Sequence, residues 1–207
     1  MNLKLITNHF EKFVPNETAP ILAEWVLKSK INVIVKPKRK SKLGDFRGAK
    51  VNEPAQITIN ADLPPYSFLI TFIHEFAHFL VWQKHKYSVA PHGKEWKSNF
   101  QKLLLDFIEK DVFPQDITEA LLLHLQSPKS SACYDENLQK VLEKHSQSET
   151  LYLEDVKTFQ IFQLENDERW FKKVKLLRKR YLCEDIESKK KYRISALARI
   201  KTLKSFS

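Results

Sequence analysis

The chain has 207 residues, of which 43% are hydrophobic, and carries 35 Lys and Arg against 25 Asp and Glu, a formal net charge of +10. This length allows one domain with a packed core and a small appendage. The chain has no apolar run near the roughly 20 residues of a membrane span, no recognisable secretory signal and only two distant cysteines, Cys133 and Cys183. These features argue against membrane-spanning and disulfide-stapled secreted proteins and predict a cytoplasmic protein.

Short helical and extended segments precede the first long apolar stretch. Residues 17–29 place apolar side chains at helical spacing, which predicts an amphipathic helix. Residues 31–36 and 54–60 are rich in β-branched side chains and short enough to be buried strands. Between them, residues 46–51 could form an edge strand, and an edge strand can hold an extended peptide by adding it to the sheet.

A run of positive charge follows the first of these predicted strands. Five of the seven residues from Lys36 to Lys42 are Lys or Arg. Such a run is usually a solvated loop. The alternative is that this run contacts nucleic acid or an acidic partner, and the positive net charge of the chain favours such a contact.

Two histidines and a glutamate interrupt an otherwise apolar helix predicted over residues 64–86. His74 and His78 are four residues apart, so they share one helix face about 6 Å apart along the axis, and both imidazoles can reach one metal ion. Glu75 projects beside that pair, where a carboxylate can take a proton from a metal-bound water without ligating the metal. Burying these groups without partners would cost several kcal/mol of desolvation each, so this HExxH arrangement favours a metal site over structural histidines.

A catalytic zinc ion usually takes three protein ligands and leaves a fourth position for water, so a third ligand is required. His85 lies on the same helix face as His78 but about 10 Å further along the axis, too far to share the metal. His92 lies in the turn-forming sequence APHG, where the chain can fold back towards the helix. We expect His92 to be the third ligand, with Glu95 as a weaker alternative.

Two further helices are predicted after this turn, over residues 94–110 and 117–126. His124 has no second ligand at helical spacing, so we expect it to be a surface or core histidine. Residues 1–126 thus form one predicted catalytic domain. Residues 127–150 are predicted to be a polar linker around a short helix.

The remaining residues, 151–207, predict a small basic β-rich module. Short strands are expected at 158–164, 169–176, 179–185 and 190–196. Residues 150–207 hold 15 Lys or Arg against 8 Asp or Glu, a net charge of +7. Such a surface could follow a phosphate backbone and stack on bases, although aromatic side chains in a small sheet are usually its core. The candidates for stacking are Trp170, Phe171, Tyr181 and Tyr192.

The HExxH helix followed by PHGKEWK resembles the SprT-like (Spartan-type) zinc metallopeptidase family, in which HExxH is followed by HGxxW or HGxxF. The residues that carry this resemblance are His74, Glu75, His78, His92, Gly93 and Trp96, and the stretch KLGDFR at 42–47 resembles a strand that the family carries ahead of the helix. The resemblance covers roughly residues 10–125. It implies a protein substrate, with DNA-associated proteins as one class. Family members often end in a zinc ribbon held by four cysteines, but this tail has only Cys183, so we expect a metal-free ribbon-like module.

Together these features predict an α+β protein, in which a zincin-like catalytic domain with helices packed on a small mixed sheet precedes the β-rich module. One catalytic Zn²⁺ held by His74, His78 and His92 would polarise the scissile carbonyl and acidify its water, while Glu75 acts as general base. No oxyanion-stabilising group is identified, although Tyr66 and Tyr87 flank the helix.

Two other functions remain open. One is a nucleic-acid-binding protein with a structural or regulatory zinc site, with DNA contacted through the Lys36–Lys42 loop and the tail at 150–207. The glutamate of the HExxH motif argues against it, because a structural site needs no base. The other is a metallohydrolase that acts on something other than peptides.

Overall fold

The computed structural model describes residues 2–39, 41–126, 135–146, 151–178 and 180–204. The chain divides into two compact units, Met1–Gln147 and Ser148–Ser207. Six α-helices and two sheets lie in the described residues, so the protein is a mixed α+β protein. No helix among these residues has the length and apolar character needed to cross a bilayer. Cys133 and half of the predicted linker, residues 127–134 and 147–150, lie outside the described residues.

The first unit contains a small mixed sheet. Its strands are β1 (Asn32–Lys36), β2 (Gly44–Arg47) and β3 (Gln56–Asn60), in the order β1-β3-β2. Strand β1 runs parallel to the central β3, and β2 runs antiparallel to it. Strand β2 therefore forms one edge of the sheet.

Strand β2 begins and ends earlier than the edge strand expected at 46–51. The chain leaves the ladder after Arg47, because residues 50–53 close a tight bend. In that bend Lys50 N donates to Glu53 O at 3.0 Å and Glu53 N donates to Lys50 O at 3.1 Å. Asn52 takes a positive φ of 64° within it.

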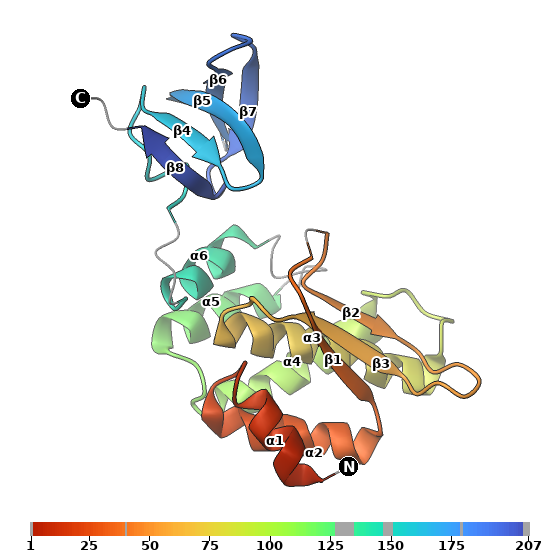
Figure 1. Ribbon diagram of the computed structural model, residues 1–207. Coiled ribbons are helices and arrows are strands. Elements are labelled where there is room, and N and C mark those ends of the chain that lie inside the picture. The colour runs from red at the N-terminus through yellow and green to blue at the C-terminus, as the bar shows by residue number, and fades with distance from the viewer. Residues whose placement is uncertain (1, 40, 127–134, 147–150, 179, 205–207) are drawn as a thin grey trace. The chain divides into compact units, whose positions relative to one another are not determined.

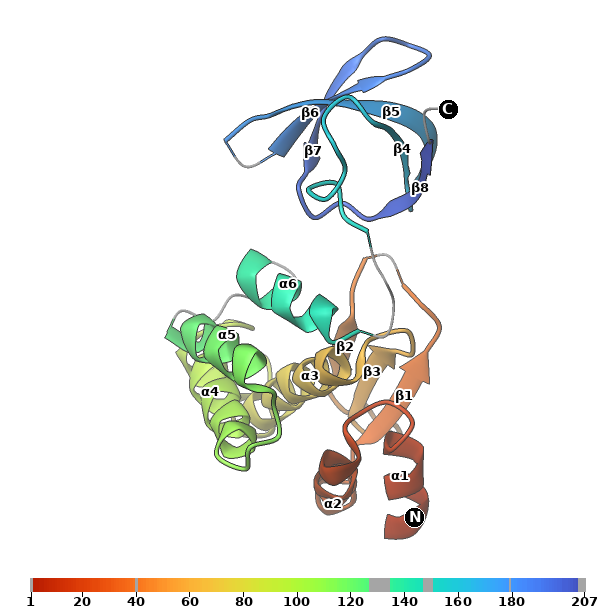
Figure 2. The same cartoon turned by 90° about the vertical axis from the view of Figure 1, so that its left-hand side faces the viewer.

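Helices form most of the first unit, and α3 (Pro65–His85) packs on one face of this sheet (Figure 1). The other helices are α1 (Leu3–Phe10), α2 (Ala19–Ser29), α4 (Lys94–Ile108), α5 (Gln115–Gln126) and α6 (Glu136–Lys144). A short 3₁₀ turn, Asn16–Thr18, precedes α2. Figure 2 shows α3 between the sheet and α4, which makes α3 the central element of the unit.

Helix α3 is apolar nearly all round because it packs on both sides. Its buried residues include Phe68, Phe72, Phe76 and Phe79. Trp25 of α2 stacks on Phe76 with ring centroids 4.9 Å apart. Burying side chains of this size stabilises the fold by about 1.5–3 kcal/mol each. The helix starts behind Pro64 and ends at Lys86, whose φ of 52° cannot continue it.

Helix α1 was not expected from the sequence. Its N-cap is Asn2, whose side-chain oxygen accepts a hydrogen bond from Lys4 N at 3.0 Å. Phe10 is buried at its end and meets Phe72 edge-on, with ring centroids 5.5 Å apart. This long-range contact, rather than a strong local pattern, anchors the helix.

The second unit is a single antiparallel sheet of five strands. The strands are β4 (Ile161–Leu164), β5 (Asp167–Leu176), β6 (Arg180–Asp185), β7 (Lys191–Ser195) and β8 (Ile200–Lys204), in the order β7-β6-β5-β4-β8. Figure 2 shows this sheet strongly curled around its own core. The module is thus larger than the expected ribbon, because β8, which the sequence analysis missed, returns to pair with β4.

A buried lysine ties the segment ahead of β4 to this sheet. Lys173 Nζ donates to the carbonyl oxygens of Leu153, Glu154 and Val156 at 2.7, 3.1 and 2.6 Å. Cys183 is fully buried nearby, and burial raises the pKa of its thiol to about 12. At neutral pH this cysteine is therefore a core residue rather than a thiolate.

Candidate metal centre

Three histidines from α3 and the following turn point their Nε2 atoms at one another. The distance between the Nε2 atoms is 3.2 Å for His74 and His78, 3.1 Å for His78 and His92, and 3.3 Å for His74 and His92. The first two share a face of α3 because they are one helical turn apart. His92 reaches them from a turn in which Gly93 N donates to Ala90 O at 3.0 Å.

Trp96 of α4 forms a common wall against all three imidazoles. Its ring centroid lies 4.7 Å from that of His74, 5.5 Å from that of His78 and 4.8 Å from that of His92. The indole is fully buried, and its Nε1 donates to the backbone oxygen of His74 at 3.3 Å. Phe100 stacks on the other side of it at 4.9 Å. This tryptophan therefore fixes the orientation of the three rings.

The environment keeps these imidazoles neutral. Burial lowers the pKa of His74 to about 3 and that of His78 to about 4, and the neighbouring imidazoles add to both shifts. Burial also lowers the pKa of His92. Neutral imidazoles offer a ring-nitrogen lone pair to a cation. These three residues could therefore hold a metal ion.

Glu75 lies on the side of α3 that faces strand β2. Its side chain is largely buried, with 7% of the residue exposed. Burial and, to a lesser extent, the charge of Asp45 raise the pKa of its carboxyl group to about 8. Lys42, Arg39 and a hydrogen bond from the backbone of Phe46 oppose that shift. The carboxyl group is therefore buried beside the edge strand, and no ion pair joins it to a cation among the described residues.

Glycine allows strand β2 to lie this close to α3. A Cβ atom at Gly44 would lie 2.7 Å from Glu75 Oε1 and 2.7 Å from Thr71 Cγ2. At Gly48 a Cβ atom would lie 2.3 Å from Trp82 Nε1. Phe46, between them, packs against α3 at Phe79 and Trp82. The two glycines thus let the backbone pass against the helix on either side of an aromatic contact.

The other candidate ligands do not join the cluster. Among the described residues, the group of potential ligand atoms consists of His74, His78 and His92, without His85 or Glu95. His124 is a core residue, because its Nδ1 lies 2.9 Å from Oδ2 of Asp135, the N-cap of α6, and its ring meets Phe100 edge-on.

The two tyrosines that flank α3 make contacts away from the histidines. Tyr66 packs against Phe113 and His145, and burial raises its pKa. Tyr87 accepts a hydrogen bond from Gly48 N at 3.2 Å. Neither contact places a phenol as an oxyanion donor.

Arg39 anchors the described part of the basic run from Lys36 to Lys42 to the sheet. Arg39 donates to Asn60 Oδ1 at 2.7 Å and to Thr58 Oγ1 at 2.9 Å. Asn60 in turn donates to the backbone oxygens of Arg39 and Lys42. The ammonium groups of Lys38 and Lys42 lie 3.8 Å from Asp62 and 2.9 Å from Asp45. Much of this charge is therefore compensated within the unit.

The sequence analysis missed the residues that shape the centre from a distance. Trp96 was noted only as part of a motif, and its contact with all three imidazoles needs the fold of α4 against α3. The close approach of Gly44 to Glu75 also depends on the pairing of β2 with β3. A glycine in a predicted strand was the available signal, because such a glycine often marks close backbone approach.

Comparisons with known proteins agree with this geometry. A model of the SprT-like family matches residues 9–112, half of the chain. The chain is also similar to Protein SprT of Klebsiella pneumoniae (strain 342), with 44% identity over 52 residues. That alignment covers 20% of this chain and 31% of the relative, so it spans under a third of that protein's length. No solved structure matches the chain.

Proposed function

Since the chain belongs to the SprT-like family, we propose that it is a zinc-dependent metalloendopeptidase in which His74, His78 and His92 hold the metal and Glu75 is the general base. One observation carries this proposal. The Nε2 atoms of three partly buried histidines, two on α3 and one on the turn after it, converge on one point beside the open edge of a sheet, and the buried carboxyl group of Glu75 lies on the same helix as the first two.

The donor set fits zinc. Imidazole nitrogen suits zinc, whereas magnesium and calcium prefer oxygen ligands. Zinc–nitrogen bonds of about 2.0–2.1 Å in a tetrahedron require ligand atoms about 3.3–3.4 Å apart. The three Nε2 separations of 3.1–3.3 Å are close to that requirement. Three protein ligands also leave one position for water or substrate, as in catalytic rather than structural zinc sites.

The chemistry then divides between the metal and Glu75. Zinc bound by imidazoles supplies a Lewis acid for the scissile carbonyl and lowers the pKa of a bound water to about 7. Glu75 would accept a proton from the attacking water and pass it to the leaving amine. A pKa of about 8 without metal suits this role, because a cation at the histidines would lower it towards the working pH.

Strand β2 offers a place for the substrate backbone. Leu43 O accepts from Asn60 N at 2.9 Å, so the alternating pattern directs Asp45 and Arg47 towards β3 and turns the backbone groups of Gly44 and Phe46 to the open edge. The hydrogen bond from the Phe46 backbone to Glu75 fits this direction. A peptide added along β2 would therefore run beside the general base.

A substitution at Gly44 tests whether β2 positions the base. Gly44→Ala places a methyl group against Glu75 Oε1, so we expect kcat to fall about 10- to 100-fold with zinc content unchanged, since small displacements of catalytic groups have large effects. Gly48→Ala is the matched control, because it places a methyl group just after the same strand, against Trp82 instead of Glu75. Full kcat in Gly44→Ala, or an equal loss in Gly48→Ala, would contradict this role.

The proposed function is tested by the class of bond that the zinc-loaded protein cleaves. We expect it to cut unfolded casein at internal peptide bonds, identified by mass spectrometry, and to lose this activity with 1,10-phenanthroline. The assay is repeated with duplex DNA and a DNA-bound basic protein, because DNA-associated proteins are the proposed substrate class. Turnover of p-nitrophenyl esters or phosphodiesters with proteins left intact would instead indicate another metallohydrolase. Bound zinc without turnover of any substrate would favour a nucleic-acid-binding protein.

A further inference from the structure

Some of the positive charges of the second unit have a carboxylate partner within the unit. Arg169 donates to Asp167 Oδ2 at 2.6 Å, Lys201 Nζ lies 3.0 Å from Glu168 Oε1, and Arg199 NH1 lies 3.8 Å from Glu165 Oε2. These residues lie on β5, β8 and the segment between β7 and β8.

A second set of positive charges gathers at the turn of the β5–β6 hairpin and on β7. It consists of Lys175, Arg178, Arg180 and Arg193, which we call the arginine face, and all four are exposed. In the part of the second unit that the structure describes, no ion pair joins any of them to a carboxylate. These four charges are therefore available to an external anion.

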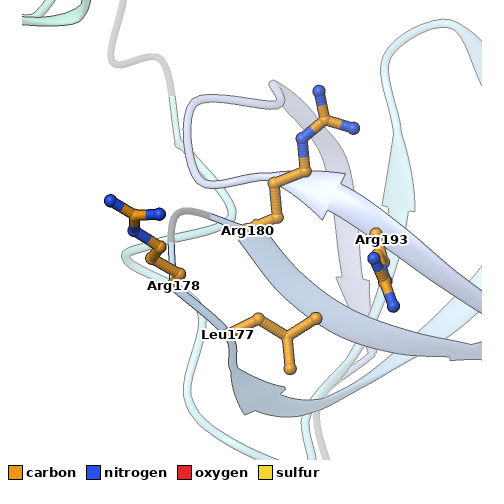
Figure 3. A pocket seen from close by; sticks show the side chains of 4 residues that line it. All are labelled: Leu177, Arg178, Arg180 and Arg193. Atoms are coloured by element: carbon orange, nitrogen blue, oxygen red, sulfur yellow. The ribbon is translucent and has the colours of Figure 1, made fainter.

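The sheet holds these side chains on one surface. Lys175 pairs with Leu182, and Leu182 pairs with Arg193, so the two cations lie on the same face of three adjacent strands. Arg180 lies two residues from Leu182 and shares that face. Figure 3 shows Arg178, Arg180 and Arg193 around a shallow hollow that Leu177 also lines.

The aromatic side chains of the second unit are not placed to stack on bases at the arginine face. Of the four aromatic residues considered for base stacking, Phe171 is buried with 1% exposure, so its expected exposure was wrong. Trp170 lies under Lys204 Nζ at 4.6 Å, and Tyr181 lies under Lys173 Nζ at 3.7 Å. The hydroxyl of Tyr192 accepts from Arg169 at 2.9 Å. These rings are engaged inside the unit, and none lines the hollow.

We propose that the arginine face binds the phosphodiester backbone of duplex nucleic acid without reading its sequence. Guanidinium groups match phosphate oxygens through paired hydrogen bonds, and unpaired clustered cations gain most from a polyanion. The absence of a stacking ring among the lining residues favours backbone contacts over unstacked bases. The surface lies beyond residues 9–112, which match the family, and does not depend on the metal centre.

Binding of the full chain to a fluorescein-labelled 20-base-pair duplex, followed by anisotropy at several NaCl concentrations, tests this proposal. For Arg180→Glu/Arg193→Glu we expect affinity to fall at least about tenfold and the slope of log K against log salt to decrease by about 2, because two phosphate contacts are lost. The charge-conserving Arg180→Lys/Arg193→Lys should keep the salt slope and lose less affinity.

A charge-matched control separates the surface from net charge. Lys4→Glu/Lys12→Glu makes the same change in charge at two exposed positions of the first unit, and we expect near-native binding. Equal losses in both double variants, or native affinity in Arg180→Glu/Arg193→Glu, would overturn the proposal. So would displacement of the duplex by polyglutamate at equal charge. If circular dichroism shows that the Glu variant is unfolded, the single variants Arg180→Gln and Arg193→Gln carry the test, each with an expected slope decrease of about 1.

Discussion

Glu75→Gln will lower kcat for peptide hydrolysis by about 10²- to 10⁴-fold, the usual contribution of a positioned general base. Glutamine has the same shape, and its side-chain oxygen can still accept the hydrogen bond from the Phe46 backbone. In the part of the chain that the structure describes, the carboxyl group forms no ion pair that the substitution would break, so we expect the fold to persist. The variant should retain one zinc per chain, because the three histidines are unchanged.

The matched control for this measurement is Glu95→Gln. Glu95 lies near the centre on α4 but outside the histidine cluster, so its kcat should stay close to that of the unmodified chain. Zinc content by mass spectrometry and cleavage of a fluorogenic peptide are measured on the same samples. A Glu75→Gln protein with full activity would rule out Glu75 as the base. If the variant instead lost its zinc, the fall in kcat would be explained by loss of the metal and not by loss of the base.

His92→Ala will weaken zinc binding by more than about 100-fold. Loss of a residue that only hydrogen-bonds to a metal ligand typically costs about 10- to 100-fold, and loss of a ligand itself should cost more. His92 lies on a turn and is only partly buried, so its removal spares the core of α3. Zinc affinity is measured by competition with a chelating indicator. Saturating zinc should raise the Tm of the unmodified chain and have little effect on the variant.

His85→Ala is the control for this prediction, since His85 lies near the end of α3 and outside the cluster. We expect its zinc affinity to be native. Native affinity in His92→Ala would exclude it as the third ligand, and Glu95→Ala would then be the next variant to examine. Loss of zinc in His85→Ala would contradict the geometry of the cluster.

Local sequence patterns predicted the parts of the molecule that depend on local geometry. The α3 helix follows from an apolar segment of helical length, and its two histidines share a face because they are four residues apart. The third histidine lies in a turn, and the structure brings it to the other two. The resemblance to the SprT-like family is confirmed by the family match over residues 9–112.

Features that depend on distant parts of the chain could not be predicted in this way. Arg39 reads as one charge in a basic loop, but it bonds to Thr58 and Asn60, some 20 positions away. The role of Gly44 requires both the pairing of β2 with β3 and the packing of β2 on α3. Strand β8 has only five residues. It pairs with β4 at one edge of the second sheet, whereas β7, the strand before it in the chain, lies at the opposite edge.

Trp96, which packs against all three histidines, has a consequence for how the centre takes up a metal ion. Trp96 is backed by Phe100, which meets the ring of His124, and His124 is tied to Asp135 at the start of α6. This stack is made of protein alone, so the imidazoles are ordered before any ion arrives. Small zinc domains fold only with their metal, whereas here a chelator should empty the centre and leave the chain folded. Under the proposed function, the folded chain can therefore lose and regain zinc, and the supply of zinc would set the active fraction of the protein.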